Sequence, residues 1–435
     1  MSLTNAHTTQ APGPDTPLTL DINVETQLTI KKLLGEYGDI VKINNQKNNG
    51  LSYLVTDPDT LKHILISNHS NYIKGPGFER VKMLLGNGII VSDGDFWRRQ
   101  RTMIQPAFSR KKIDQLCEMI KVVTQNMIPR WKQKAKNGEA IDITTEMSEF
   151  ALEVILRALL SDDLDRIIEE HDGNPFGFLT DDTTRDLTVA MRFRQLGKVI
   201  QKVVDTRREQ NQAGEDLLGS MMAATDKEGQ HMTDKELIDE VMTMIIAGHE
   251  TTGGTLNWVW YELSRNPDAE VLAYQEASSL VANNSVSTDQ IGELKYIKQC
   301  INEALRLYPP VWLFSRQAIN GDLLGKYSIP AGTNIYLCPY YTHRDPKLWS
   351  EPDQFHPEHF KNDGANLKHK YAFIPFSAGS RRCVGEYFSY VEMQTHLAIL
   401  LNLFKLDAVA GQEIEIEPAI NLRTKNSIMM QISLR

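Results

Sequence analysis

A long segment that is apolar on almost every side constrains the fold of this chain most strongly. Residues 237–263 would place apolar side chains on nearly all faces of a helix, and Thr233 and Glu236 form a capping box at its start. A helix of this kind lies at the centre of a large protein or in a membrane. Polar groups in the middle of the run favour a central helix of a soluble fold, which Asn266 and Pro267 should end.

The remaining periodicity predicts a mainly α fold with small β-sheets. A second helix should begin at the Ser287–Gln290 capping box and end near residue 307, and a third should cover residues 386–404. Strand patterns occupy residues 40–43, 52–56, 328–338 and 429–434. Since no Gly/Ser-rich or Pro-rich linker divides the chain, we expect one large domain over residues 23–435, after a flexible tail over residues 1–22.

Composition excludes several classes of protein. The 435 residues include 56 acidic and 47 basic side chains, and the net charge of −9 argues against nucleic-acid binding. No apolar run reaches the roughly 18 residues of a membrane span, and the first residues lack a secretory pattern. Four cysteines stand far apart, at positions 117, 300, 338 and 383, which favours neither disulfides nor structural zinc. We therefore expect a cytoplasmic protein without a membrane span.

The segment from Phe376 to Gly385 is the first candidate site. Cys383 lies between two glycines and two arginines, directly before an apolar helix. Gly379 permits a tight turn, and a helix N-terminus with neighbouring arginines stabilises a thiolate, the form that binds metal. A buried structural cysteine in a loop is the competing interpretation.

The middle of the central helix is the second candidate. Glu250 and Thr251 place an acid beside a hydroxyl in an apolar helix, an arrangement that suits proton delivery. Thr251 should bond back to the carbonyl of residue 247 and distort the helix locally, although a packing irregularity would look similar. Glu303 and Arg306 lie three residues apart on one helix face and can pair, as many surface residues do.

Taken in this order, the three motifs resemble those of the cytochrome P450 family of haem-thiolate monooxygenases. The resemblance spans about residue 25 to the C-terminus, and His359 departs from the family pattern because an arginine usually stands there. The family's cysteine-loop pattern matches Phe376, Gly379, Arg381, Cys383 and Gly385. Its oxygen-activation pattern matches Ala247, Gly248, Glu250 and Thr251. Its ExxR pattern matches Glu303 and Arg306, and its WxxxR pattern matches Trp97 and Arg101.

The resemblance implies the P450 fold, with haem between the central long helix and the cysteine-loop helix. It implies haem b (iron protoporphyrin IX) with Cys383 as the axial thiolate ligand, while the other three cysteines pack the core. Glu250 and Thr251 would relay protons during dioxygen activation, and Glu303, Arg306 and His359 would form a structural ion-pair network. Haem would be contacted by Trp97, Arg98, Arg101, Ala247, Arg316, Phe376, Arg381 and Gly385.

The implied reaction inserts one oxygen atom from O₂ into a hydrophobic small molecule, by C–H hydroxylation or epoxidation. Electrons would come from a separate ferredoxin or flavodoxin with its reductase, and the protein would be a monomer. A haem-thiolate isomerase or dehydratase, and a haem-based gas sensor without turnover, are the alternatives, and the acid–threonine pair argues against the sensor. The expected substrate pocket is lined by Phe78, Met83, Ile90, Met244, Val311, Trp312 and Phe314, although each of these could instead pack the core.

Overall fold

The structure is a computed structural model that describes residues 10–21, 23–45, 50–181, 187–212, 214–365 and 367–435. The chain is mainly helical with small sheets, as the sequence predicts. It forms two compact units, each built from stretches that are distant in sequence. The first unit contains residues up to Phe78, Leu305–Cys383 and Ile416–Arg423, and the second contains Glu79–Ala304, Val384–Glu415 and Thr424–Arg435.

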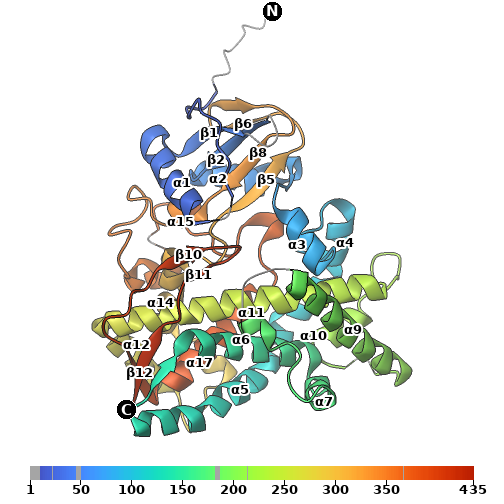
Figure 1. Ribbon diagram of the computed structural model, residues 1–435, viewed down its shortest axis with the longest axis vertical. Coiled ribbons are helices and arrows are strands. Elements are labelled where there is room, and N and C mark those ends of the chain that lie inside the picture. Colours follow the sequence, from blue (N-terminus) through green and yellow to red (C-terminus); the bar gives the residue numbers. More distant parts are fainter. Residues whose placement is uncertain (1–9, 22, 46–49, 182–186, 213, 366) are drawn as a thin grey trace, which may run out of the picture. The chain divides into compact units, whose positions relative to one another are not determined.

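A five-stranded sheet with strand order β1-β2-β8-β5-β3 forms the framework of the first unit (Figure 1). β2 and β8 are parallel, and the other neighbouring strands are antiparallel. Helix α1 (Val24–Tyr37) buries Ile30 and Leu33 in a cluster with side chains of β1 and β2. The strands are β1 (Ile40–Asn45), β2 (Gly50–Val55), β3 (Tyr72–Lys74), β5 (Phe314–Ala318) and β8 (Asn334–Leu337).

Short elements complete the first unit. They include a β-hairpin, one π-helical turn and several single-turn helices. They are α2 (Pro58–Lys62), the π-helix η1 (His63–Ser67), the 3₁₀ turns η2 (His69–Asn71), η4 (Pro357–Phe360), η5 (Lys370–Ala372) and η6 (Gly379–Arg381), the hairpin β6 (Asp322–Leu324) and β7 (Tyr327–Ile329), α15 (Pro339–Thr342), α16 (Lys361–Gly364), β10 (Ile416–Pro418), and β11 (Leu422–Thr424), whose last residue belongs to the second unit.

The described part of the N-terminal segment lies on this sheet. Ala11 is buried in the core of the unit, Lys42 N–H donates to Pro12 O at 2.9 Å, and Leu18 N–H donates to Asn44 O at 2.8 Å. Within the predicted tail, Pro12 and Leu18 are therefore hydrogen-bonded to the edge strand β1. Residues 1–9 and 22 of that tail lie outside the described residues.

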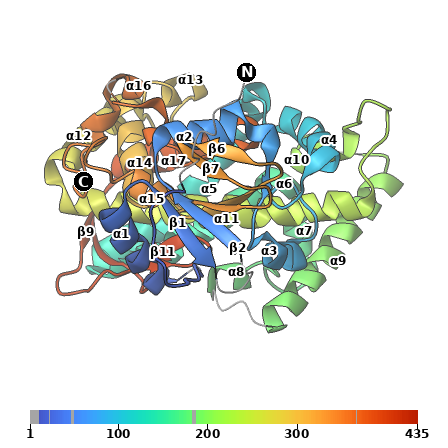
Figure 2. The ribbon, with the colours of Figure 1, turned by 90° about the horizontal axis from the view of Figure 1, so that it is seen from above.

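Helices dominate the second unit, and the apolar run of the sequence is its helix α11 (Asp234–Arg265), with the predicted capping box at Thr233 and Glu236. α11 packs along α6, and Figure 2 shows it extending between α12 and α9. Among the described helices, none is both long and apolar enough to cross a membrane. The other helices are α3 (Phe78–Leu85), whose first residue belongs to the first unit, α4 (Gly94–Ile104), η3 (Gln105–Phe108), α5 (Arg110–Asn137), α6 (Ile143–Leu160), α7 (Asp163–Glu170), α8 (Phe178–Asp181), α9 (Leu187–Glu209), α10 (Leu217–Ala223), α12 (Pro267–Leu280), α13 (Thr288–Ile291), α14 (Lys295–Leu307), whose last three residues belong to the first unit, and α17 (Glu386–Leu401).

A three-stranded antiparallel sheet also belongs to this unit. Its strand order is β4-β12-β9, and Leu434 of β12 pairs with Phe404 of β9. The sequence placed Phe404 in the preceding helix, but α17 ends at Leu401 because this pairing takes the chain into a strand. The strands are β4 (Ala140–Asp142), β9 (Phe404–Ala408) and β12 (Met429–Leu434).

Two predicted elements are divided in the structure. The helix expected over residues 287–307 is α13 followed by α14, and Glu276 of α12 accepts hydrogen bonds from Tyr296 N–H and Ile297 N–H, two donors of the first turn of α14. The strand expected over residues 328–338 is β7 and β8, separated by a turn. Pro330 has no N–H for a sheet, and Gly332 adopts a φ of +77° in that turn.

Asp322 joins three segments of the first unit. Its Oδ2 accepts hydrogen bonds from the Tyr72 hydroxyl at 2.5 Å and the Asn68 amide at 2.8 Å, and lies 2.8 Å from His63 Nε2. Burial opposes ionisation of this carboxyl, but the bonds from Tyr72, His63 and Asn68 outweigh it and lower the pKa to about 2. The ionised carboxylate therefore attaches η1, Asn68 and the first residue of β3 to β6.

We predict that Asp322→Asn lowers the free energy of unfolding by about 1–3 kcal/mol at pH 7, because hydrogen bonds to a charged acceptor are lost. The carboxylate contributes fully above its unfolded-state pKa near 4, and its contribution disappears as the pH falls to about 2. Urea denaturation at several pH values measures both effects. Asp59→Asn is the control, since Asp59 lies 3.3 Å from His369 with 83% of its side chain exposed. Equal losses of unfolding free energy in the two variants would contradict a stabilising role for the hydrogen bonds to Asp322.

Candidate active site

The residues predicted to act at the site belong to both units. The first unit contains the cysteine loop and strand β5, which carries Arg316. The second contains α4, the middle of α11 and the start of α17. The first unit thus holds Arg306, Arg316, His359, Phe376, Arg381 and Cys383, and the second holds Trp97, Arg98, Arg101, Ala247, Glu250, Thr251, Glu303 and Gly385.

The cysteine loop is closed by its own backbone. Cys383 N–H donates to Phe376 O at 3.0 Å, and Arg382 N–H donates to Gly379 O at 3.1 Å. Gly379 has a φ of +69°, and a Cβ added there would lie 2.0 Å from Leu65 O. Glycine is therefore required at position 379 both by the left-handed backbone and by the close approach to η1. The sequence predicted the turn, but not the contact with Leu65.

The thiol of Cys383 is the exposed one among the four cysteines. Cys117, Cys300 and Cys338 are buried, and burial raises the pKa of the Cys338 thiol to about 12. Gly385, the N-cap residue of α17, differs from Gly379, because an added Cβ would meet only Phe108, at 3.8 Å. Contacts within the protein thus do not demand glycine at 385, which agrees with a bulky group approaching this backbone. An accessible thiol beside such a backbone fits thiolate ligation of haem.

Arg316 is a buried cation on β5. Its side chain donates to Ser315 O at 2.9 Å and lies 5.0 Å from the centre of the Phe314 ring, while only 5% of the residue is exposed. Arg381, in the cysteine loop of the same unit, is half-buried. Guanidinium groups stay charged when buried and bind carboxylates through two parallel bonds. Both arginines have the chemistry that a haem propionate requires.

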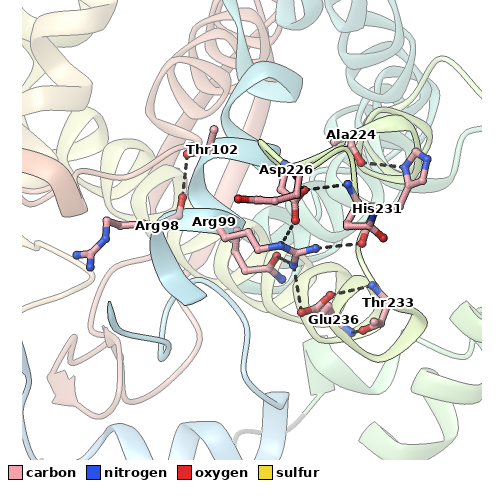
Figure 3. A network of polar contacts seen from close by, with 11 residues as sticks. Arg98, Arg99, Thr102, Ala224, Asp226, His231, Thr233 and Glu236 are labelled. Atoms are coloured by element: carbon pink, nitrogen blue, oxygen red, sulfur yellow. Dashed lines mark hydrogen bonds and ion pairs between the residues drawn. The ribbon is translucent and has the colours of Figure 1, made fainter. Parts of the chain in front are cut away.

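Three predicted haem contacts lie on α4, and they differ in environment. Trp97 is buried, and half-buried Arg101 donates to Gln105 at 3.2 Å. Arg98 is exposed and donates to Asp95 at 3.1 Å. Figure 3 shows Arg98 and the adjacent Arg99 extending in different directions from α4. Trp97 and Arg101 are therefore better placed in the fold than Arg98 to hold a fixed cofactor.

A narrow accessible stripe interrupts the buried surface of α11. Ala247, Glu250, Thr251 and Gly254 are half-buried, whereas almost every other residue from 241 to 263 is buried. The spacing of three and four residues places them on one helix face. Thr251 Oγ1 donates to Ala247 O at 2.7 Å, which confirms the predicted back-bond. The stripe presents one carboxyl and one hydroxyl in an apolar setting, as proton delivery requires.

The opposite side of α11 packs against α6, a contact that the sequence did not predict. His249 Nε2 lies 2.8 Å from Ser148 Oγ. A Cβ added to Gly248 would lie 2.9 Å from Ile155, and one added to Gly253 would lie 3.0 Å from Met147 O. The pair of glycines five residues apart was the signal that could have indicated a close helix–helix contact.

The predicted substrate-facing residues have different environments. Met244 is buried on α11, Phe78, Ile90 and Phe314 are half-buried, and Met83 and Val311 are exposed. Trp312 is fully buried in the core of the first unit, and its indole N–H donates to Ala419 O at 2.9 Å. This burial favours core packing, the competing interpretation for this position.

Arg306 and His359 both contact Trp349. The Arg306 guanidinium lies 5.1 Å from the Trp349 ring centre and donates to the carbonyl oxygens of His343, Pro352 and Gln354. The ring centroids of His359 and Trp349 are 5.4 Å apart, and His359 Nε2 lies 3.0 Å from Ser350 O. An aromatic ring therefore links the two residues that the sequence placed in one ion-pair network.

Glu303 lies on the same helix as Arg306. Both residues are fully buried. Among the residues that the structure describes, no group of three His, Cys, Asp or Glu side chains could hold a metal ion directly.

Comparisons with known proteins agree on one family. The model for "Cytochrome P450" matches residues 19–174 and 174–431. Cyclooctatin synthase of Streptomyces melanosporofaciens is 30% identical over 85% of this chain and 84% of its own length. A chloroplastic carotene epsilon-monooxygenase of Arabidopsis thaliana is 28% identical over 94% of this chain and 82% of its own. In the crystal structure of the cytochrome P450DA haem domain the same fold recurs, with a TM-score of 0.85, 22% identity and 98% coverage of both chains.

We predict that Gly379→Ala destabilises the protein more than Gly411→Ala does. Gly411 has a φ of +80° with nothing within 4 Å of an added Cβ, so its variant should show only the backbone cost of about 1–2 kcal/mol. Gly379→Ala adds the collision with Leu65 O. Urea midpoints and the ratio of haem absorbance to protein absorbance measure the two variants. Equal midpoints together with equal haem content would contradict the required close approach of Gly379 to η1.

Proposed function

Because the chain belongs to the cytochrome P450 family of haem-thiolate monooxygenases, we propose that it inserts one oxygen atom from dioxygen into a hydrophobic organic molecule. Membership of the family implies a haem held by a cysteine thiolate. The observation that carries the proposal is the accessible Cys383 thiol in a loop closed onto Phe376, directly before α17. Haem with a thiolate ligand supplies the iron chemistry that activates dioxygen and oxidises the substrate.

In this proposal Cys383 binds the iron of haem b, and the surrounding residues hold the macrocycle. Arg316 and Arg381 bind propionates, and Trp97 and Arg101 of α4 supply a further donor and cation, with exposed Arg98 as the outermost contact. Phe376, Ala247 and Gly385 contact the ring. The burial of Arg316 and Trp97 supports these roles, because a cofactor has to be held by groups that do not move.

Glu250 and Thr251 are the proposed proton-relay residues. Their accessible position on α11 supports this, since a relay must reach both the reacting oxygen and water. The Thr251 hydroxyl uses its proton to bond Ala247 O and keeps lone pairs to accept a further hydrogen bond. It can therefore hold a water or an oxygen atom in place while Glu250 exchanges protons with solvent.

Hydrocarbons are the proposed class of substrate. The side chains expected to face the substrate are apolar, and half-buried Phe78, Ile90 and Phe314 lack polar atoms that would select a charged ligand. One relative is named for carotene, a hydrocarbon built from isoprene units. Isoprenoid hydrocarbons are thus the first compounds to test, with hydroxylation or epoxidation as the outcome. A ferredoxin or flavodoxin with its reductase would supply the electrons, and the enzyme would act as a cytoplasmic monomer.

Ligation by Cys383 predicts a specific spectrum. Reduced protein with carbon monoxide should show the far red-shifted Soret band of a thiolate-bound haem, and Cys383→His should lose that band while keeping its fold by circular dichroism. Cys117→Ala, which removes a buried thiol, should keep the band. Haem-supplied, folded wild-type protein without this band would refute the proposed function. A band without turnover under any redox partner would favour the gas-sensor alternative, and turnover without reductant would favour the isomerase.

The relay predicts that Thr251→Ala uncouples electron consumption from product formation. A positioned proton-transfer group contributes about 10²–10⁴-fold, so we expect product per electron pair to fall roughly tenfold or more, with peroxide released instead. Product and peroxide are measured together during turnover with a surrogate ferredoxin system. Thr255→Ala is the matched control, because Thr255 makes the same back-bond, to Thr251 O, at a buried position. Equal coupling in the two variants would remove Thr251 from the relay.

A further inference from the structure

The turn of residues 86–89, between α3 and α4, rests directly on the first turns of α11. Gly86 has a φ of +78°, and a Cβ added there would lie 2.1 Å from the Asp239 carboxylate. A Cβ added to Gly88 would lie 2.2 Å from Thr243 Oγ1. A side chain at either position would therefore collide with groups of α11, and at Gly86 the left-handed φ also favours glycine.

Two consecutive acids of α11 hold this turn by its backbone. Asn87 N–H donates to Asp239 Oδ2 at 2.8 Å, and Ile89 N–H donates to Glu240 Oε2 at 2.9 Å. Neither bond belongs to a helix or a sheet. The position of the turn thus depends on the two carboxyl groups. Ile90 directly follows Ile89, the residue that bonds Glu240.

Glu240 also connects the turn to α4. Its Oε1 accepts a hydrogen bond from Gln100 Nε2 at 3.3 Å, and both side chains are fully buried. The neighbouring Arg99 donates to Glu236, one turn earlier on α11, at 3.2 Å, and to Asp226 at 2.6 Å (Figure 3). Adjacent residues of α4 therefore reach successive turns of α11, and Glu240 is the point at which the turn, α4 and α11 meet.

We propose that Glu240 is a positioning residue: with Asp239 it clamps the turn of residues 86–89 onto α11, and so sets where Ile90 stands toward the hydrophobic substrate. The clamp itself follows from the contacts of the folded chain. Its effect on substrate choice rests on the proposed function, in which Ile90 faces the substrate.

The charge of Glu240 makes the clamp sensitive to pH. Burial raises its pKa to about 8, Asp239 and Glu236 act in the same direction, and the bonds from Ile89 and Gln100 oppose them. The other charged groups of this region are Arg99 and Asp226, which bond each other, and Lys235, which bonds Asp239.

In an opened turn Glu240 would be hydrated and have an ordinary pKa near 4. The closed turn consequently loses stability as the pH rises from about 4 to about 8, and changes no further above that range.

Hydrogen exchange at the amides of Asn87 and Ile89, in substrate-free protein, tests the clamp. We expect Glu240→Leu to lower their protection factors at least tenfold at pH 7. Glu392→Leu is the matched control, because Glu392 is a fully buried acid of α17 whose pKa is also raised by burial. Unchanged protection in Glu240→Leu, or an equal loss in both variants, would overturn the clamp.

Glu240→Gln keeps the shape and the acceptor but cannot ionise, so it tests the clamp even if Glu240→Leu does not fold. Wild-type protection factors, corrected for intrinsic exchange, should fall between pH 6 and 8 by up to tenfold per pH unit, because one proton is linked to opening. Those of Glu240→Gln should stay constant. A parallel decline in the two proteins would overturn the pH dependence.

Spin-state titrations with a panel of isoprenoid hydrocarbons of different length test the effect on substrate choice. Glu240→Leu should change the order of the dissociation constants while keeping the carbon monoxide spectrum of the wild type. An unchanged order with weakened amide protection would overturn the positioning of substrate through Ile90. A wild type without the thiolate spectrum would refute the proposed function, and the exchange result would still decide whether Glu240 holds the turn.

Discussion

The close contact between α11 and α6 is the constraint on which the rest of the second unit depends. Gly248 and Gly253 leave no room for side chains on this face, and the bond between His249 and Ser148 fixes the rotation of α11 about its axis. With that rotation set, Glu250 and Thr251 can only emerge on the opposite, accessible side. A larger residue at either glycine would move the helix, and with it the acid and the hydroxyl.

Acidic side chains, fully buried at Glu240 and half-buried at Glu276, connect the elements of this unit. Glu276 accepts hydrogen bonds from two N–H groups in the first turn of α14. Glu240 accepts one from the backbone of the turn of residues 86–89 and one from the Gln100 side chain. Because an unsatisfied buried donor costs about 1–3 kcal/mol, each acid determines the position of the segment that donates hydrogen bonds to it. Glu276 in particular sets the start of α14, the helix that carries Glu303. These acids thus position residues elsewhere in the unit.

In the first unit, a short chain of contacts joins Arg306 to the cysteine loop. Arg306 donates to His343 O, and the His343 imidazole accepts a bond from Ile374 N–H, two residues before Phe376. Burial lowers the pKa of His343 to about 3, so the ring stays neutral and remains an acceptor at physiological pH. The carbonyls that bind Arg306, and the Trp349 ring against it, explain how the arginine is satisfied although position 359 holds a histidine.

Local sequence patterns determined the elements, the capping boxes and the three motifs, because periodicity and capping act over a few residues. Thr251 and its bond to Ala247 O belong to this class. The divided helix before Arg306, the role of Trp312 in the core, the contact of Gly379 with Leu65 and the clamp at Glu240 were decided only by the tertiary structure. Each depends on a partner 20 to more than 300 residues away, and a single sequence does not show which distant groups will satisfy a buried donor or fill the space beside a glycine.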